Sequence, residues 1–319
     1  MLAAGRGHRL GSLGQTRSKA MQPILGIPII GHILADLNAL GWNEIIVVTA
    51  AQDDGLQGFL RRPGIDGVTV RQVVQTQPLG MAHALEQAAG LLHQDFLLIA
   101  CDNRVPRVEL HNMIDHWQQR PELQGLLGLL EIPASKVSQS GIVKMRGAQV
   151  VQIVEKPAPG AAPSSTASIP FYCLRPAFLD ILSAVEVSER GERELQDALQ
   201  VLIDRSAQVE GWHFSQRKAL SYPEDLLSMN LQALQRHLPA SDVRSKQIAS
   251  GVQFIPPLLV EAQVVIGAGS LIGPNVYLEA GARIGRQVRL SECLVLRQGR
   301  IADGCAVHGA VIGQKQTEG

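Results

Sequence analysis

The sequence has no excess charge of either sign, few aromatic residues and few cysteines. Lysine plus arginine number 29 and aspartate plus glutamate number 29, which argues against a surface for nucleic acid or for an anionic membrane. The cysteines form no Cys-x-x-Cys pair, so we expect neither a zinc site nor a disulfide framework, but a reducing compartment. We interpret all four as buried, small apolar side chains: Cys101, Cys173, Cys293 and Cys305.

Long apolar runs and a signal peptide are also missing. No stretch approaches the roughly 18 apolar residues of a membrane-spanning helix, and the sequence therefore predicts a cytoplasmic protein with no membrane partner. The chain has 319 residues, of which 45% are hydrophobic, and this is enough for two domains with a sizeable core.

A segment rich in glycine and cations, LAAGRGHRLGSLGQTRSKAM, runs from Leu2 to Met21. Its first residues are typical of the end of a buried strand. Gly5 and Gly7 allow backbone N–H groups to approach an anion, and Arg9 and Lys19 add charge that neutralises phosphate. The spacing is not that of a Walker A loop, and the third glycine of the dinucleotide fingerprint is missing. By itself the segment indicates either an anion site or an ordinary turn after a strand.

The whole segment resembles the signature of the sugar-1-phosphate nucleotidyltransferases, the family that makes nucleoside-diphosphate sugars. It departs from the family's usual Pro-Lys-Pro, because Ser18 and Ala20 flank Lys19. The family's first strand begins several residues earlier, so we expect either a misplaced start codon or a clipped strand here. The resemblance implies catalytic roles for Arg9 and Lys19, and nucleotide-binding roles for Leu2, Ala3, Ala4, Gly5 and Gly7.

Apolar, strand-like runs alternate with helical patterns up to about residue 130, which predicts an α/β fold with a doubly wound, mostly parallel, Rossmann-like sheet. We place this nucleotidyltransferase domain at residues 1–236, followed by a linker at 237–250. Residues 158–168, rich in Pro, Ala and Ser, are expected to form a flexible surface loop. The expected helices cover residues 29–40, 79–92, 108–117, 194–206 and 223–235, and the expected strands cover 44–50, 68–74 and 95–100.

The last part of the chain repeats with a period of six residues. This spacing predicts a parallel β-helix at residues 251–319, in which each turn stacks on its neighbours. By resemblance to hexapeptide proteins we expect left-handed winding. The anchors are Val260, Ile266, Ile272, Leu278, Ile284, Leu290 and Leu296, and a second series is Val264, Ser270, Val276, Ala282, Val288 and Leu294.

Two segments resemble the family's base-binding loop and metal site. In QTQPLGMAHA, Gln75 offers a donor and an acceptor to a pyrimidine edge, and Gly80 lets the backbone approach the base. We interpret His83 as a packing or surface residue. Asp102 follows a buried strand and matches the metal-binding aspartate, which implies Mg²⁺ as the cofactor. A solvated Gln and a strand-end turn are the alternative interpretations of these two segments.

The run Ile153 to Pro157 resembles the family's sugar-phosphate face, and the resemblance assigns sugar-phosphate binding to Gly141, Glu155 and Lys156. An ordinary solvated turn is the alternative there. Two positions depart from the family. Ala219 stands where a second metal-binding aspartate is usual, and Pro170 lies in a segment where the family has an Asn and a Gly lining the sugar pocket.

These resemblances imply transfer of a nucleoside monophosphate from a nucleoside triphosphate, with UTP or dTTP favoured, to a sugar-1-phosphate. The alternative is a catalytically weakened homologue that binds nucleotide and regulates a catalytic partner. Oligomerisation through the β-helix is expected, either with itself or with a catalytic homologue. Acyl transfer by the β-helix is disfavoured, because its one candidate base is His308, at the end of the coil.

Overall fold

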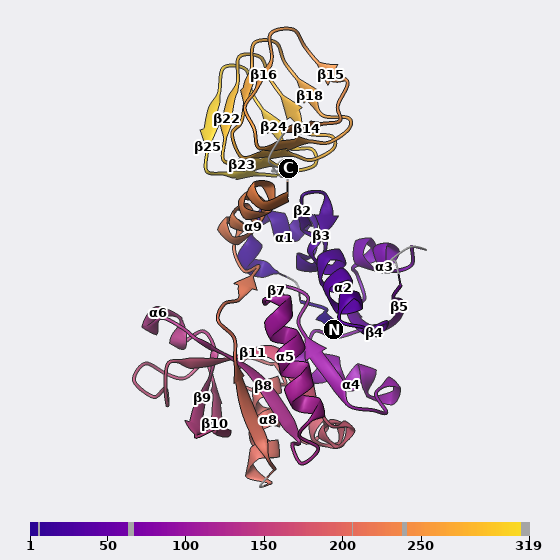
Figure 1. Ribbon diagram of the computed structural model, residues 1–319, viewed down its shortest axis with the longest axis vertical. Coiled ribbons are helices and arrows are strands. Elements are labelled where there is room, and N and C mark those ends of the chain that lie inside the picture. Colours follow the sequence, from indigo (N-terminus) through magenta and orange to yellow (C-terminus); the bar gives the residue numbers. More distant parts are fainter. Residues whose placement is uncertain (6, 63–66, 206, 238–240, 314–319) are drawn as a thin grey trace. The chain divides into compact units, whose positions relative to one another are not determined.

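The computed structural model describes residues 1–5, 7–62, 67–205, 207–237 and 241–313, which form two compact units (Figure 1). The first unit comprises Met1–Gly5 and Ile33–Lys218. The second unit comprises Arg6–His32 and Ala219–Gly319. The boundaries drawn from the sequence at residues 236 and 250 stay a prediction.

A three-stranded parallel sheet opens the first unit, with β1 (Leu2–Ala3), β4 (Glu44–Ala50) and β5 (Thr69–Gln75) in that order. Leu2 also forms a parallel bridge with Ala100, just after β6 (Phe96–Ile99). Parallel neighbours need crossovers, and helices supply them. The α/β class predicted from the sequence is therefore confirmed. The helices are α2 (Ile29–Ala39), α3 (Asp54–Leu60) and α4 (Met81–Ala88), the last followed by η3 (Ala89–Leu91).

A second sheet of the first unit has the order β6-β11-β8-β12-β10-β9. Most of its pairs are antiparallel, which the pattern before residue 130 did not indicate, and β12 pairs with β8 in parallel. A tight turn joins β9 to β10, and such a turn can only join antiparallel strands. The strands are β8 (Gly125–Glu131), β9 (Gly141–Arg146), β10 (Gln149–Glu155), β11 (Thr166–Leu174) and β12 (Val209–His213).

The loop predicted at residues 158–168 ends earlier than expected. Residues 166–168 belong to β11, because they pair with β8 and contribute buried side chains.

The other elements of the first unit include β7 (Asn103–Arg104), α5 (Arg107–Gln118), α6 (Ala134–Val137), η4 (Pro176–Phe178), α7 (Leu179–Leu182) and α8 (Leu195–Asp204); β13 (Lys218–Ala219) lies at the unit boundary.

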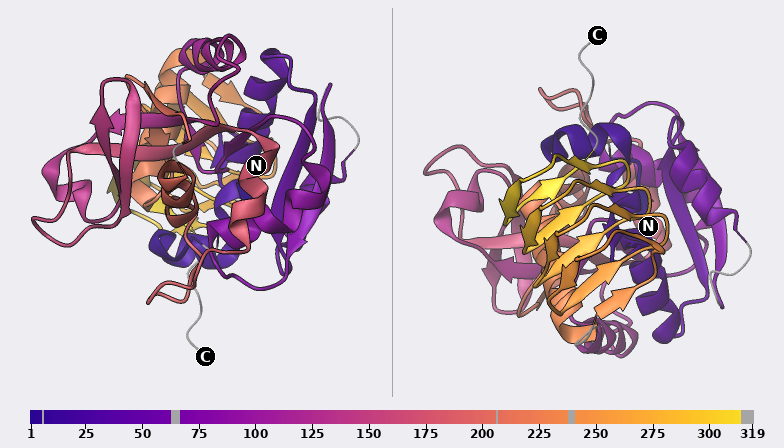
Figure 2. Two further views of the ribbon diagram at one scale, coloured as in Figure 1. Left: turned by 90° about the horizontal axis from the view of Figure 1, so that it is seen from below. Right: turned by 90° about the horizontal axis from the view of Figure 1, so that it is seen from above.

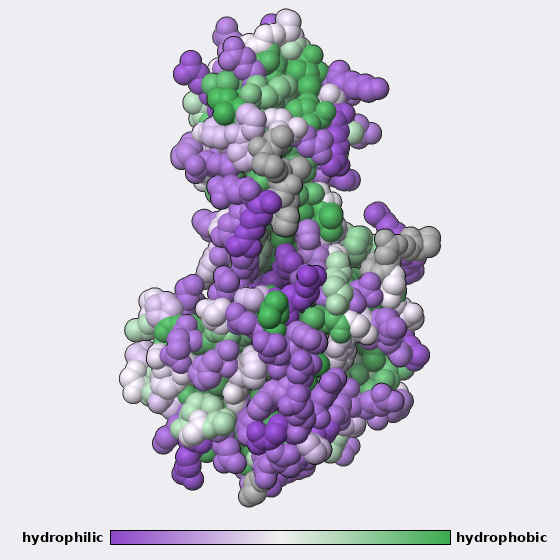
Figure 3. Space-filling model, in the orientation of Figure 1, coloured by the Kyte–Doolittle hydropathy of each residue, from purple (hydrophilic) through white to green (hydrophobic). Residues whose placement is uncertain are grey.

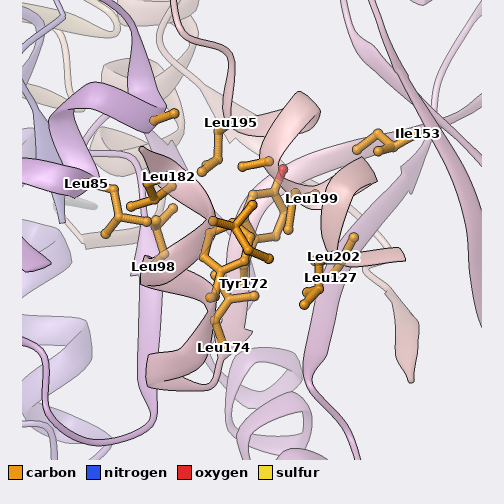
Figure 4. Packing of buried hydrophobic residues seen from close by; sticks show 14 of the residues in the cluster. Leu85, Leu98, Leu127, Ile153, Tyr172, Leu174, Leu182, Leu195, Leu199 and Leu202 are labelled. Carbon is orange, nitrogen blue, oxygen red and sulfur yellow. The ribbon is translucent and has the colours of Figure 1, made fainter. Parts of the chain in front are cut away.

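The core of the first unit lies between its sheets and the helices that cover them. Tyr172 of β11 is fully buried in it, with Leu127 of β8 and Leu199 of α8 nearby (Figure 4). Burial raises the pKa of the Tyr172 hydroxyl, and Ser168 forms a 2.7 Å hydrogen bond with it. The buried hydroxyl is thus satisfied, as the low-dielectric core requires.

The second unit contains a coil of three parallel sheets (Figures 1 and 2). Strands eighteen residues apart stack on one another, for example Leu258 on Val276 and Ile266 on Ile284. Eighteen residues make three hexapeptides per turn, so the six-residue period has its structural explanation. All anchors predicted from the two series are buried.

Each face of the coil is one of these sheets. The strands are β14 (Ser241–Val243), β17 (Leu258–Val260), β20 (Val276–Leu278), β23 (Cys293–Val295) and β26 (Val311–Ile312) in the first; β15 (Gln247–Ile248), β18 (Val265–Ile266), β21 (Arg283–Ile284) and β24 (Arg300–Ile301) in the second; and β16 (Gln253–Phe254), β19 (Leu271–Ile272), β22 (Arg289–Ser291) and β25 (Ala306–His308) in the third.

In the first coil sheet the spacing is seventeen residues, instead of eighteen, from β14 to β17, from β20 to β23 and from β23 to β26. Leu278 pairs with Val295, seventeen residues away, instead of with the anchor Leu296. Cys293 and Val295 therefore join the apolar core of the coil. A one-residue shift moves side chains to the opposite face of a strand, which is why the core changes from even to odd positions here.

The remaining part of the second unit is the segment that follows β1 together with one long helix. The elements are η1 (His8–Leu10), α1 (Ser12–Thr16), η2 (Lys19–Met21), β2 (Pro23–Ile24), β3 (Ile27–Pro28) and α9 (Pro223–His237).

Within the described residues, no helix has the length and apolarity needed to cross a membrane. The visible face of the coil carries apolar and hydrophilic residues side by side (Figure 3).

All four cysteines are free thiols, and all but Cys305, which is half-buried, are buried. The expectation of four buried thiols is wrong for Cys305 alone, because it lies near the end of the coil where fewer turns cover it.

We expect Gly267→Ala to destabilise the coil. A Cβ at Gly267 would lie 2.5 Å from the carbonyl carbon of Gly285, so successive turns must move apart. Overpacking of this kind costs about 1–3 kcal/mol, measurable by thermal unfolding. Gly58→Ala in α3 is the control, because nothing lies within 4 Å of its Cβ, and alanine there should stabilise by about 0.5–1 kcal/mol. Equal stability of the Gly267 variant and the wild type would contradict the tight stacking.

Candidate functional site

The carboxyl ends of the parallel strands of the first unit meet at one edge. Ala3 pairs with Thr49, and Ala50 pairs with Gln75, so Ala4 and Gly5 leave the sheet beside the end of β5. The bridge of Leu2 to Ala100 brings Asp102 to the same edge. Open α/β sheets bind ligands at this edge. The structure thus brings together the predicted residues of β1 with Gln75 and Asp102.

Gln75 is buried and held in place by two contacts. Its Nε2 donates to the carbonyl oxygen of Gly80 at 3.1 Å and lies 3.0 Å from Nδ1 of His83. The amide hydrogens are used within the protein, so the chemistry left to the side chain is that of the acceptor Oε1. His83, interpreted from the sequence as a packing or surface residue, also contacts Gln75 and helps to orient it.

Gly80 precedes α4 with φ 95°, a conformation that favours glycine. A Cβ there would lie 2.6 Å from the carbonyl oxygen of Arg193. The backbone of Arg193 also donates to Leu79 and accepts from Ala82. Glycine at position 80 is therefore required by close packing against residues 192–193, a reason that the motif alone did not reveal.

Asp102 and its neighbour Asn103 present oxygen atoms at the edge. Nδ2 of Asn103 donates to Oδ1 of Asp102 at 2.6 Å. Oδ1 of Asn103 is buried and has no hydrogen-bond partner among the described residues. Carboxylate and amide oxygens are the ligands that Mg²⁺ prefers. In the described part of the chain no group of three or more His, Cys, Asp or Glu residues could hold a metal.

The predicted sugar-phosphate residues lie together on β9 and β10. Gly141 pairs with Glu155, and the backbone N–H of Lys156 donates to Ser140. Nζ of Lys156 lies 3.1 Å from Oε1 of Glu155. A Cβ at Gly141 would lie 3.0 Å from Oε2 of Glu155 and 2.9 Å from Cγ of Gln196, so the glycine makes room for both side chains.

Glu155 carries an unusual carboxylate. Burial raises its pKa, while the nearby Lys156 ammonium acts in the opposite direction. Oε2 of Glu155 and Oε1 of Gln196 are both buried and lack hydrogen-bond partners among the described residues. Buried acceptors without donors are costly, and they mark a place where a ligand with donors gains binding energy.

Sequence reasoning missed Gln196 and Arg190. Arg190 donates to Glu194 at 2.8 Å and lies 4.0 Å from Glu155, so its positive charge partly compensates these two carboxylates. Nothing in the sequence showed that Gln196 faces Gly141. Burial and the nearby Glu194 also raise the pKa of Asp197.

Pro170, which departs from the family pattern, lies at an irregularity of β11. The pairing of β11 with β8 shifts between Ile169 and Tyr172. Proline has no N–H to donate and is found in sheets at such bulges. That the local backbone contact to the sugar differs from the family's stays a prediction.

The predicted cations belong to the second unit. Gly7 has φ 69°, and a Cβ there would lie 3.0 Å from Cγ of Lys19, so the lysine stem lies along the glycine. Arg9 lies over the ring of Tyr222, with 5.5 Å from its guanidinium carbon to the ring centroid. Gly14 packs on the carbonyl of Gly7, where a Cβ would come within 2.5 Å. Ala219, in β13, has no atom that ligates a metal.

We expect Glu155→Gln to stabilise the fold at neutral pH while weakening sugar-phosphate binding. A raised folded-state pKa means that ionised Glu155 costs stability above that pKa, and that the cost vanishes below the unfolded value of about 4.3. The variant should therefore unfold at a higher Tm than the wild type at pH 7 and at the same Tm near pH 4. Its KM for sugar-1-phosphate should rise about tenfold or more.

Glu44→Gln is the control for this comparison, because Glu44 forms an exposed ion pair with Arg71. It should change neither the difference in Tm between pH 7 and pH 4 nor the KM for sugar-1-phosphate. A Tm of Glu155→Gln that is lower than that of the wild type at pH 7 would contradict the burial cost.

Two family profiles match the chain. The profile of the family described as nucleotidyl transferase matches residues 1–218, and one described as GMPPB C-terminal domain matches residues 254–319. The chain is similar to the low-salt glycan biosynthesis nucleotidyltransferase Agl11 of Haloferax volcanii, with 28% identity over 98% of this chain and 93% of the relative. It is also similar to a glucose-1-phosphate thymidylyltransferase of Streptomyces griseus, with 27% identity over 98% and 87%.

Among solved structures, apo UDP-glucose pyrophosphorylase shares the fold, with a TM-score of 0.67 and 22% identity over 74% of this chain and 98% of that chain. The relatives are named as transferases, which does not favour a purely regulatory homologue. The family profile covers more than half of the chain. The chain therefore belongs to the nucleotidyl transferase family.

Proposed function

We propose that the protein transfers a nucleoside monophosphate from UTP or dTTP to a sugar-1-phosphate and releases pyrophosphate. The observation that carries the sugar half of this proposal is the pair of buried acceptors, Oε2 of Glu155 and Oε1 of Gln196, which lack donors among the described residues. Sugar hydroxyls are donors of the right kind. Lys156 next to them supplies a cation for the phosphate of the same substrate.

The choice of base rests on Gln75. Its Oε1 is the acceptor that remains after Nε2 has bound Gly80 and contacted His83. Uracil and thymine carry an N3–H donor in the ring that suits this acceptor, whereas adenine and cytosine offer a donor at the pairing edge only through an exocyclic amino group. Guanine also carries a ring N–H donor, and its exclusion depends on the size of the site.

In the proposed reaction, a phosphate oxygen of the sugar-1-phosphate attacks the α-phosphorus of the triphosphate in line. The bond from the α-phosphorus to the bridging oxygen breaks, and pyrophosphate takes the electron pair. Arg9 and Lys19 neutralise the triphosphate and the charge that develops, while Lys156 and Glu155 hold the attacking substrate. Positioning and charge stabilisation supply most of the rate enhancement in such transfers.

A magnesium ion fits the oxygen atoms at the edge of the sheet. Asp102 would hold it, with the unpartnered Oδ1 of Asn103 nearby and with phosphate and water oxygens completing the coordination. Bound there, Mg²⁺ would draw charge from the α-phosphate oxygens. A cytoplasmic location and an oligomer formed through the coil remain predictions.

Pyrophosphate release measures the activity directly. With Mg²⁺, a panel of nucleoside triphosphates and a panel of sugar-1-phosphates, the wild type should turn over UTP or dTTP. Lys19→Met should lower kcat/KM by about a hundredfold or more, because the charge it neutralises is largest in the transition state. Nucleotide binding without any turnover, across the whole panel, would contradict the proposal and support the regulatory homologue.

Gln75→Ala should raise the KM for the preferred nucleotide by about five- to tenfold, because it removes one base contact. The KM for sugar-1-phosphate should stay unchanged in the same assay. Gln72→Ala is the matched control on the same strand, where the side chain only bonds the backbone of Gln57. An equal rise of KM for all four bases would show that Gln75 does not read the base.

A further inference from the structure

The phosphate-binding segment of this chain belongs to the unit that contains the coil. Residues Arg6–His32 cluster with Ala219–Gly319, although the strand that precedes them belongs to the first unit. We propose that the coil holds this segment in shape through an ion pair between Arg17 and Glu279, which makes both positioning residues for Gly7, Arg9 and Lys19. The effect of this ion pair on the KM for nucleotide rests on the proposed function, whereas the support that the coil gives to the segment does not.

The ion pair is well defined at its acidic end. Nη2 of Arg17 donates to Oε1 of Glu279 at 2.8 Å, and the Glu279 side chain is only 6% exposed. The other carboxylate oxygen accepts from the backbone N–H of Arg297 at 2.8 Å. Glu279 is thus a buried charge fixed by the turns of the coil. The Arg297 guanidinium lies farther away, with its Nε 3.8 Å from Oε1, so removing Arg17 would leave the buried charge with the weaker of its two cation contacts.

The ion pair is also connected at its basic end. Arg17 is the C-cap of α1, and its carbonyl oxygen accepts from Nε2 of Gln22 at 3.0 Å. Gln22 is 1% exposed and donates to Leu13 as well. Arg17 therefore cannot move without disturbing α1 and the turn that carries Lys19.

Helix α1 passes this constraint to the glycine turn. Its Gly14 packs so closely on the carbonyl of Gly7 that a Cβ would come within 2.5 Å of the oxygen. Gly7 in turn supports the stem of Lys19. Glu279, Arg17, α1, Gly7 and Lys19 thus form one continuous set of contacts within the second unit.

Two further contacts hold the hairpin at the end of the segment. The turn at Gly26, with φ 83°, lies against Glu261 of the coil, where a Cβ would come within 2.4 Å of Oε1. The hydroxyl of Tyr277 donates to that same oxygen at 2.7 Å. These coil residues leave space for a glycine only. The hairpin is therefore shaped to the coil.

The second contact comes from α9. The fully buried Asn230 accepts from the backbone N–H of Leu25 at 2.9 Å and donates to the carbonyl of Pro23 at 3.0 Å. Both ends of the amide are used, so the position is specific. Of these three contacts the Arg17 pair is the one that reaches α1 and the glycine turn, and it is the pair to test.

Kinetics of full-length variants test the positioning role. Arg17→Gln and Glu279→Gln should each raise the KM for the nucleoside triphosphate roughly tenfold, because small displacements of phosphate-binding groups are costly. The KM for sugar-1-phosphate should stay within twofold, because Glu155 and Lys156 belong to the first unit. The double variant should be no worse than the worse single variant, since both changes remove the same interaction.

Matched controls come from the same coil. Arg244→Gln breaks an exposed pair with Asp242, and Glu292→Gln removes an exposed carboxylate. Both should keep the wild-type KM values. An equal rise of KM for both substrates, accompanied by a lower Tm, would indicate general destabilisation and overturn the proposal. Additive effects of the two substitutions on the nucleotide KM of the double variant would also overturn it.

Hydrogen exchange tests the scaffolding without any turnover. Amides of residues 7–22 should exchange at least tenfold faster in Glu279→Gln than in the wild type, while amides of β4 and β8 should not change. If the wild type shows no turnover, the proposed function is refuted, but hydrogen exchange still tests whether the coil supports residues 7–22. Wild-type exchange in the variant, or unchanged nucleotide KM in an active enzyme, would overturn the inference.

Discussion

Parallel pairing of short strands is the constraint on which both units depend. In the first unit it brings the ends of β1, β5 and β6 to one edge, where Gln75 and Asp102 lie. In the second unit it stacks strands eighteen residues apart into a coil. Parallel strands need crossovers of defined length. Helices provide them in the first unit and the hexapeptide turns in the second, so one pairing rule produces both a binding edge and a rigid scaffold.

The candidate site is marked by polar groups that the protein itself leaves without partners. Glu155, Gln196 and Asn103 each contribute a buried oxygen that has none among the described residues. Among the described residues, buried polar atoms of Ser18, Thr49, Trp212 and Asn275 also lack a partner, whereas the amide of Asn230 and the hydroxyl of Tyr172 are satisfied. Unsatisfied acceptors cost folding free energy, and they are retained where binding a ligand recovers it.

Much of this arrangement could be predicted from local sequence. Helix α2 and strand β4 lie within a residue of their expected bounds, because their apolar periodicity is strong. The antiparallel strands after residue 125 and the true extent of β11 were not predicted, since their pattern does not reveal the direction of pairing. The sequence explained Gly80 only by the approach of its backbone to a base. Its close packing against Arg193 could not be predicted, because the two residues lie far apart in the chain.

The sequence by itself determined the α/β class, the repeating coil and the family, because glycine spacing, hexapeptide period and strand patterns are local properties. Only the tertiary structure decided that Gln196 faces Gly141, that His83 orients Gln75 and that Arg17 pairs with Glu279. Each of these contacts depends on the packing of distant elements. The shift from Leu296 to Val295 between β20 and β23 was likewise decided by stacking, because hydrogen-bond register selects which side chains point inward.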